Sequence, residues 1–370
     1  EYGDPPPPLG SEPRGTIFLN LAWLRTAALA LRRLISRGTL ARVALAQRLG
    51  IPPSAATQRQ HGIDCACYYT ENLFVRSPVE GHFCFEGRTA FERRERPLLE
   101  SLSFEARDEL LSMLEAEAAR RRGIVPAAAA RKARVAAEYS PLHPELWTLC
   151  ERWLHRDFVA LVEQARAGEL RRPPQLAPGI YTLPVFSELF CRLLTEELAH
   201  FGASGLPVGQ PNSMNRHGAL LDELGLSAGL LDPLLSDWLR PLCAALPPLA
   251  AAGGASIDHH KAFVVAYRLG EDESLSMHVD NAEVTLNVNL GGGFEQGELL
   301  FYGRTAHPLA HHDWHDGGGV GHGVLHLGAQ AHAALPITSG ERLNLVIWMR
   351  SRARRREAGC PMCGQTDRLL

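Results

Sequence analysis

The chain has 370 residues, of which 45% are hydrophobic and 21% are charged, and its formal net charge is -3. This composition indicates an ordinary globular protein with room for two domains and excludes a chain that is disordered throughout. The small net charge makes nucleic acid an unexpected partner, and no apolar run approaches the roughly 20 residues of a membrane span.

Cysteine usage bears on the compartment. Eight cysteines are spread over the whole length of the chain, whereas disulfide scaffolds are short and dense in cysteine. No Asn-x-Ser/Thr glycosylation site occurs. Together these features predict a reducing, intracellular compartment.

Residues 1–63 form a Pro- and Arg-rich extension. Residues 1–13 are Pro-rich and are expected to be disordered. Residues 14–63 contain eight arginines and no acidic residue around an apolar segment, which is also the composition of a mitochondrial transit peptide. Glu1, Asp4 and Glu12 precede that segment and favour a plain helical extension, with mitochondrial targeting as the alternative.

Residues 64–175 are expected to form a mostly helical accessory region. Short strands are predicted within 65–75 and 81–87, and apolar positions at helical spacing predict a helix over 98–122. The helical pattern continues over 126–166, with breaks at Ser140-Pro141 and His143-Pro144. Cys65 and Cys67 are too isolated to predict a metal site.

A Pro-rich linker leads into a short extended segment and a helix over 186–201, for which Ser187 is the expected N-cap. Residues 202–225 are predicted to be a loop followed by a helix, and residues 230–250 another apolar helix.

From Lys261 onwards the pattern changes to strands, predicted over 261–267, 283–290, 297–303, 323–328 and 342–349. Val284, Leu286 and Val288 alternate with polar residues, which predicts one buried face and one solvent-facing face. Helices followed by strands predict an α+β fold, with helices backing one sheet of a sandwich or jelly roll.

Three residues in this strand region have the types and spacing of a metal site. His278 and Asp280 are two residues apart, so an extended strand directs both side chains to one face. The 51 residues before His332 leave room for about four short strands, which lets a distant strand return with a third ligand. Two imidazoles and one carboxylate are the ligand set of non-haem Fe(II) oxygenases.

Other histidines offer competing interpretations. His311 and Asp313 have the same spacing, but they are expected in a Gly-rich loop that does not align the side chains. A His-rich zinc protein that uses the segment 307–332 is a further alternative. His326 falls within a predicted strand and is expected to be a core residue.

Arg342 favours the oxygenase interpretation. It follows His332 by ten residues, at the expected start of the next strand. An iron oxygenase that uses a 2-oxo acid must bind the far carboxylate of that acid, and a guanidinium does so with two parallel hydrogen bonds. A surface arginine in an Arg-rich chain is the simpler alternative for this residue alone.

The segments MHVDNAEVTLNVNL, GGGFEQGELLFYG and HAALPITSGERLNLVIWM resemble 2-oxoglutarate- and Fe(II)-dependent dioxygenases of the prolyl and lysyl hydroxylase type. The resemblance covers about residues 179–350. It implies a double-stranded β-helix (jelly roll) in a catalytic domain at 176–352, with buttressing helices. It also implies Fe(II) on His278, Asp280 and His332, 2-oxoglutarate and O2 as co-substrates, and ascorbate as a reductant.

The resemblance further implies that Arg342 holds the far carboxylate of 2-oxoglutarate. Tyr267 falls where such enzymes often place a tyrosine that binds the same carboxylate, although a core aromatic is an equal alternative. Asn344 is expected to line the same pocket. We predict no catalytic residue beyond the metal ligands, because the protein need supply no separate acid or base.

The predicted function is therefore hydroxylation of an unknown substrate, with a peptide or protein side chain favoured by the resemblance. The alternative is a non-catalytic, metal-binding jelly roll that serves as an interaction module. Residues 353–370 are predicted to be a basic tail, in which Cys360 and Cys363 form half a zinc site or a redox pair.

Overall fold

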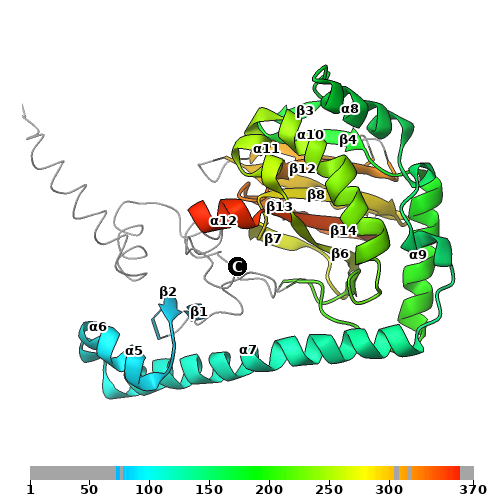
Figure 1. The fold of residues 1–370 in the computed structure, drawn as a ribbon. Coiled ribbons are helices and arrows are strands. Elements are labelled where there is room, and N and C mark those ends of the chain that lie inside the picture. The colour runs from blue at the N-terminus through cyan, green and yellow to red at the C-terminus, as the bar shows by residue number, and fades with distance from the viewer. Residues whose placement is uncertain are drawn as a thin grey trace, which may run out of the picture.

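The computed structural model describes residues 72–75, 78–79, 81–212, 214–303, 308–315 and 319–358 (Figure 1). The predictions for the extension 1–63, for Cys65 and Cys67, and for Cys360 and Cys363 concern residues outside the described part. Within that part, no helix combines the length and the apolar character that crossing a membrane would need.

The N-terminal elements form a small unit with its own core. They are β1 (Asn72–Val75), β2 (Gly81–Cys84), α5 (Arg88–Arg94), α6 (Arg96–Glu100) and the first turns of α7 (Phe104–Glu138). Leu73, Phe83, Phe91 and Leu110 are among the side chains that fill this core. Both strands lie within the predicted ones, but α5 was not predicted, and the two helical segments on either side of Pro126 are one continuous helix.

Helix α7 leads from this unit to the rest of the molecule (Figure 1). Ser103 caps it, since its side-chain oxygen accepts a hydrogen bond from the backbone N–H of Ala106. Between Leu114 and Val135 none of its described side chains is buried. The main hydrophobic core begins at Val135, so the residues that follow α7 pack together with the strand region.

A second group of helices covers one face of the main sheet (Figure 1). These elements are η1 (Pro144–Trp147), η2 (Glu151–Trp153), α8 (Arg156–Ala167), α9 (Glu188–Ala203), η3 (Ser227–Leu231), η4 (Leu234–Leu239), α10 (Arg240–Ala245), α11 (Pro247–Ala251) and η5 (Gly254–Ser256). Ser187 caps α9 as predicted, with its hydroxyl oxygen accepting from the N–H of Phe190.

The helix predicted within residues 202–225 is wrong. The chain there forms the short edge strand β5 (Gly218–Leu220), which pairs with β6 (His259–Arg268) and is followed by a turn. Gly218 has φ 141°, and a Cβ atom there would lie 1.9 Å from the carbonyl oxygen of Val264. The leucines that follow have the spacing of a helix, but they lie in a turn and their side chains pack in the core. Leu221 and Leu226 are fully buried.

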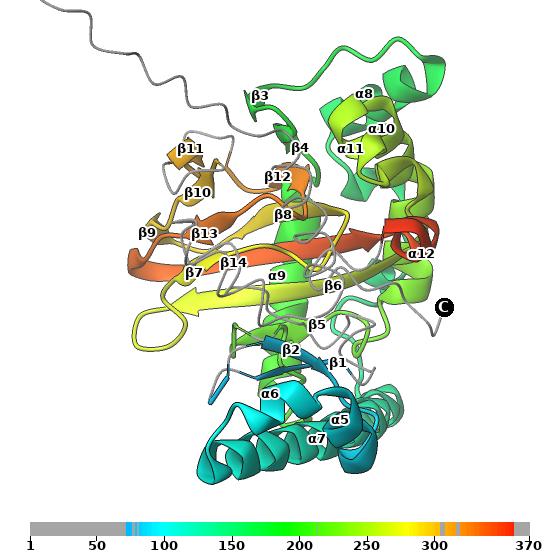
Figure 2. The same ribbon diagram turned by 90° about the vertical axis from the view of Figure 1, so that its left-hand side faces the viewer.

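The remaining strands form two antiparallel sheets (Figure 2). The larger has the order β3-β4-β12-β8-β14-β6-β5, with β9 also paired to β14, and the smaller has the order β11-β10-β13-β7. Their bounds are β3 (Gln175–Ala177), β4 (Ile180–Pro184), β6 (His259–Arg268), β7 (Leu275–His278), β8 (Val284–Gly291), β9 (Phe294–Gln296), β10 (Leu299–Tyr302), β11 (Pro308–His312), β12 (His322–Leu327), β13 (His332–Ala334) and β14 (Ile337–Arg350).

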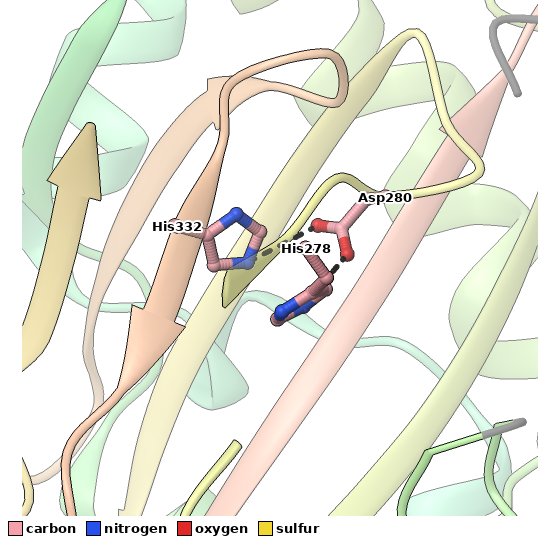
Figure 3. A group of neighbouring side chains, drawn as sticks. All are labelled: His278, Asp280 and His332. Carbon is pink, nitrogen blue, oxygen red and sulfur yellow. Dashed lines mark ion pairs between the residues drawn. The ribbon is translucent and has the colours of Figure 1, made fainter. Parts of the chain in front are cut away.

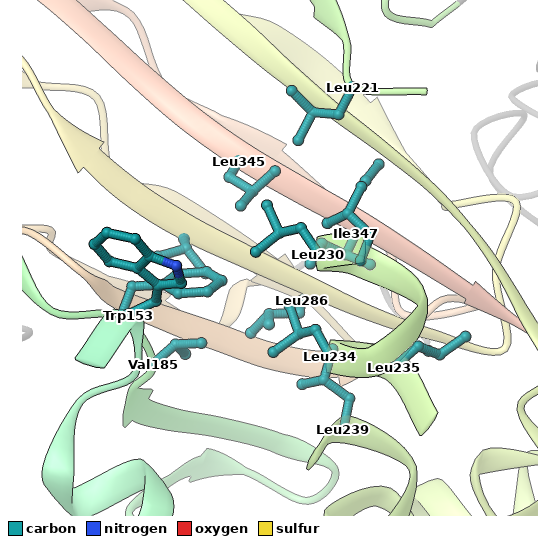
Figure 4. Close-up of a cluster of buried hydrophobic side chains, with 14 of the residues drawn as sticks. Trp153, Val185, Leu221, Leu230, Leu234, Leu235, Leu239, Leu286, Leu345 and Ile347 are labelled. Atoms are coloured by element: carbon teal, nitrogen blue, oxygen red, sulfur yellow. The ribbon is translucent and has the colours of Figure 1, made fainter. Parts of the chain in front are cut away.

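Strand alternation gives the larger sheet two different faces. Leu286, Leu345 and Ile347 point towards the helices and pack with side chains such as Trp153 and Leu234 (Figure 4). On the opposite face, Phe263, Val265 and Val346 pack with Leu299 and Ala334 of the smaller sheet. Helices on one face and a second sheet on the other confirm the predicted α+β class.

The polar face of β8 was predicted to meet solvent, and that prediction is wrong. Thr285 and Asn289 are only 1% and 4% exposed. Their face is turned towards the smaller sheet, where Asn287 lines an internal pocket. The alternation of the sequence was interpreted correctly, but the polar face is covered by protein instead of water.

The last helix, α12 (Arg352–Ala358), is fixed to the segment between β7 and β8. Buried Arg355 donates to the carboxylate of buried Glu283 at 3.1 Å, and the same carboxylate accepts from the N–H of Ser351 at 2.7 Å. Arg350 Nε donates to the carbonyl oxygen of Asn281 at 2.8 Å. These contacts hold residues 281–283 in place.

We expect Arg355→Leu to lower the free energy of unfolding by about 3 kcal/mol, because Glu283 would stay buried without its cation. Urea denaturation followed by circular dichroism measures this change. Arg354→Leu, at an exposed position of the same helix, is the matched control and should change stability by less than about 0.5 kcal/mol. Equal losses in the two variants would show that the ion pair is unimportant.

Candidate functional site

The smaller sheet brings the three predicted ligands together (Figure 3). His278 is the last residue of β7, Asp280 follows two residues later, and His332 begins β13. Because β13 pairs with β7 in antiparallel register, His332 lies directly opposite His278. One ligand atom from each residue lies within 4.8 Å of the others, and among the described residues this is the one such group of three or more.

The hydrogen bonds of the two histidines orient their rings. Nδ1 of His278 donates to the carbonyl oxygen of Ser276 at 2.8 Å, and Nδ1 of His332 donates to that of Gln330 at 2.9 Å. With Nδ1 as the donor, a neutral ring carries its lone pair on Nε2. Each Nε2 faces Asp280, at 3.5 Å from Oδ1 for His278 and 3.7 Å from Oδ2 for His332. Such backbone contacts fix the tautomer that a metal needs.

Asp280 is 3% exposed and is held from two sides. Its Oδ2 accepts a 2.7 Å hydrogen bond from the Thr285 hydroxyl, and its backbone N–H donates to the carbonyl oxygen of Gly328 at 2.8 Å. Burial alone would raise the pKa of Asp280, but His332 and His278 hold it well below the ordinary value. Asp280 is therefore ionised at neutral pH.

His332 is neutral at the same pH. Burial, reinforced by the nearby His278, lowers the pKa of His332 to about 3. A metal ion displaces protons from its ligands when these are protonated. Asp280 and His332 thus already have the protonation states in which they bind a cation.

His326 was predicted to be a core residue on a strand, and it is fully buried on β12. Its proximity to the predicted metal ligands was not predicted. Its Nδ1 donates to the carbonyl oxygen of Leu327, while its Nε2 lies 4.0 Å from Asp280 Oδ2 without a hydrogen-bond partner. Its ring centroid is 4.7 Å from that of His332. A third imidazole therefore lies beside the predicted ligands.

Arg342 and Tyr267 lie next to each other on the neighbouring strands β14 and β6. The guanidinium carbon is 4.0 Å from the centre of the tyrosine ring, and Arg342 is 1% exposed. Its Nη1 donates to the carbonyl oxygen of Gly297, but its Nε has no hydrogen-bond partner. Gly297 has φ 80°, and a Cβ atom there would lie 2.5 Å from Nη1, so a glycine makes room for the guanidinium.

No carboxylate of the described residues forms an ion pair with Arg342, and Glu298 acts on it only from a longer distance. Burial lowers the pKa of its guanidinium from the ordinary value, against the charge of Glu298, which raises it, yet a guanidinium remains protonated in proteins. A buried cation without an acidic partner is costly unless a ligand supplies the negative charge.

A pocket lies between the two sheets, and its cavity volume is about 40 Å³. The three predicted ligands and Tyr267 line it, whereas Arg342 is not a lining residue and contacts the pocket wall through the Tyr267 ring. Asn344 is behind the wall: its Nδ2 donates to the wall residue Asn287 at 2.6 Å. The other lining residues are Asn212, Met214, Asn215, Phe263, Val265, Leu275, Val279, Asn281, Leu299, Ala334, Val346 and Trp348.

The competing histidines lie elsewhere. His311 was expected in a loop, and that prediction is wrong, because His311 and His312 lie on β11, which pairs with β10. The imidazole of His312 is buried and contacts Trp314 edge-on, with ring centroids 4.7 Å apart. Within the described part of the segment 307–332, only His332 belongs to a group that can share a metal ion.

Known proteins share much of this sequence. The profile of the OGFOD2-like domain matches residues 135–251. Human 2-oxoglutarate and iron-dependent oxygenase domain-containing protein 2 is 42% identical over 330 residues, which cover 84% of this chain and 91% of that protein. The Arabidopsis thaliana 2-oxoglutarate and iron-dependent oxygenase domain-containing protein CP2 is 33% identical over 230 residues, or 59% of this chain and 58% of that protein.

A solved structure also matches, that of a prolyl hydroxylase from Trichoplax adhaerens in complex with a peptide fragment of the hypoxia inducible factor oxygen degradation domain. Its TM-score is 0.37 and its identity 15%, over 56% of this chain and 98% of that one. A likeness at this distance carries no weight in the assignment.

Divalent metal should stabilise the chain through this site. Fe(II) or Mn(II) added without oxygen, at a free concentration of 100 times the dissociation constant, should raise the free energy of unfolding by about 2.7 kcal/mol. Thermal unfolding followed by circular dichroism measures the rise in melting temperature. His278→Ala and Asp280→Ala should abolish it, and His311→Ala, at an exposed histidine, should retain it. A rise that persists in the first two variants would place the metal elsewhere.

Proposed function

The chain belongs to the family of 2-oxoglutarate and iron-dependent oxygenase domain-containing protein 2, and we propose on this basis that it hydroxylates a peptide or protein side chain. It is a 2-oxoglutarate-dependent oxygenase by family. The proposal adds the reaction type, the residues that carry it and the class of substrate. Its main support is Arg342, a buried guanidinium without an ion-pair partner among the described residues, which packs on Tyr267 in the wall of a pocket lined by three side chains able to hold a metal.

We propose that His278, Asp280 and His332 hold Fe(II). The fit rests on their chemistry, since two Nε2 lone pairs and one carboxylate converge within 4.8 Å. Two imidazoles and one carboxylate leave open positions on an octahedral metal. When bound, Fe(II) supplies the activation of O2, so that one oxygen atom enters the substrate as a hydroxyl group and the other enters succinate, with release of CO2.

The residues around the ligands have supporting tasks. Thr285 restrains the carboxylate of Asp280 through its 2.7 Å hydrogen bond, which keeps one oxygen directed at the metal position. The backbone carbonyls of Ser276 and Gln330 hold the two imidazole rings. Burial of all three ligands excludes water from the site.

Arg342 is the proposed anchor of 2-oxoglutarate. Its free Nε can donate to the far carboxylate, and charge-assisted hydrogen bonds to a carboxylate are among the strongest in proteins. Tyr267 lies against the guanidinium and on the wall of the pocket, where its hydroxyl, which interacts with Arg342 and Asn215, would also donate to the same carboxylate. Asn344 acts one step further away, by orienting the carboxamide of Asn287.

The two antiparallel sheets, which face each other across the pocket, are the proposed two sides of a double-stranded β-helix. The catalytic domain expected at 176–352 then also includes residues 135–175, which share its core, and helix α12, which is paired with Glu283. The accessory region is reduced to residues 64–134 and the tail to residues 359–370. Ascorbate, which would keep the iron reduced, is proposed from the family likeness alone.

We expect His278→Ala and Asp280→Ala each to abolish succinate formation from 2-oxoglutarate, since two protein ligands no longer fix the metal in its position. Succinate is measured by mass spectrometry after incubation with Fe(II), 2-oxoglutarate, O2 and fractions of a cell extract, together with a search for products heavier by one oxygen atom. His311→Ala is the matched control. Undiminished turnover in either ligand variant would refute the site, and wild-type protein that binds metal without turnover would favour a non-catalytic module.

Arg342→Met should raise the KM for 2-oxoglutarate by roughly 10- to 100-fold, because it removes charge-assisted hydrogen bonds worth about 1.5–3 kcal/mol. The initial rate of succinate formation at a series of 2-oxoglutarate concentrations gives this constant. Arg268→Met, at the exposed end of β6, is the control and should leave KM within twofold. A KM unchanged by Arg342→Met would remove this residue from the binding site.

A further inference from the structure

Three side chains in the pocket, those of Asn215, Asn281 and Trp348, carry polar atoms without a hydrogen-bond partner among the described residues, and the last two lie on the side of the metal ligand Asp280. Asn281 is 1% exposed, yet neither its Oδ1 nor its Nδ2 has a hydrogen-bond partner. Trp348 is 6% exposed, and its indole N–H also has none. Both residues line the pocket together with His278 and Asp280. Buried polar groups are almost always hydrogen-bonded, so these atoms indicate the place of a ligand.

The positions of both side chains are fixed by their surroundings. The carbonyl oxygen of Asn281 accepts hydrogen bonds from Arg350 and Arg355, which anchors its backbone beside the metal ligand Asp280. Trp348 lies on β14, and its ring packs edge-on against Phe263 at a centroid distance of 5.0 Å. The two side chains therefore offer hydrogen-bonding atoms at set positions.

The charge of the pocket wall limits what can enter. Apart from the three proposed metal ligands, its lining residues are amides, aromatic residues and aliphatic residues without formal charge. Asp280 is committed to the metal, so no carboxylate is left to pair with an ammonium group. The ammonium of Lys261 is not part of the pocket wall, but it lies 5.7 Å from the centre of the Trp348 ring and further disfavours a second cation. A buried charge without a partner is costly.

We propose that Asn281 and Trp348 bind backbone amides of a peptide substrate, and that the side chain presented to the metal is uncharged. This inference rests on the proposed oxygenase function. A carboxamide offers one acceptor and one donor side by side, which match the N–H and C=O of a single extended residue. The indole N–H supplies a donor for a further carbonyl oxygen. Phosphate-bearing substrates are disfavoured, since the wall has no cation to receive them.

The test uses the full chain loaded with Fe(II) and 2-oxoglutarate without oxygen, so that binding is measured in the absence of turnover. Calorimetry compares three capped tripeptides, acetyl-Gly-Leu-Gly-amide, acetyl-Gly-Lys-Gly-amide and acetyl-Gly-Glu-Gly-amide. The leucine peptide should bind at least tenfold more tightly than the two charged peptides. Equal or tighter binding of a charged peptide would overturn the inference, as would binding of none of the three to a chain that binds 2-oxoglutarate.

Variants separate recognition from a structural role. Asn281→Leu and Trp348→Phe should each weaken binding of the leucine peptide about tenfold, because each removes a hydrogen bond to the substrate. Trp238→Phe, on the helix-covered side of the sheet, is the matched control and should bind normally. Normal affinity in the two pocket variants would overturn the assignment. A wild-type chain that never turns over 2-oxoglutarate would instead refute the proposed function itself.

Discussion

The pairing of β13 with β7 is the contact on which the site depends. Residues directly opposite each other in an antiparallel pair have their side chains about 5 Å apart, so this register alone places His332 beside His278. Asp280, just beyond the end of β7, completes the group. The carboxylate is costly to bury, and the hydrogen bond from the Thr285 hydroxyl offsets part of that cost. A shift of one residue in the register would turn His332 away from its partners.

The two faces of the larger sheet differ in character: one belongs to the main hydrophobic core, and the other carries the candidate site. Its helix-covered face is almost entirely aliphatic and aromatic, as Leu286, Leu345 and Ile347 show. Its other face carries Thr285, Asn289 and Arg342, whose burial is unfavourable for folding unless each finds a partner. Hydrophobic burial on one face thus supports polar groups on the other, which is the usual relation between a core and a functional site.

Much of this arrangement could be predicted from the sequence. The alternation around Val284 identified a strand with two unlike faces, and the spacing of His278, Asp280 and His332 predicted the group of three side chains that the structure brings together. The sequence could not reveal that the polar face of β8 is covered by a second sheet, because alternation does not say what each face meets. His326 and Asn281 were missed for a related reason: the partners available to their polar atoms depend on distant strands.

The separation of the two hydrophobic cores has a thermodynamic consequence. The small unit built on β1, β2, α5 and α6 shares no buried side chain with the main core, and α7, about 50 Å long, lies between them. Arg131 and Lys132 attach the far end of that helix to Glu223 and Asp222. Opening of the small unit therefore costs only its own packing energy, and the two units behave as separate cooperative units of one chain.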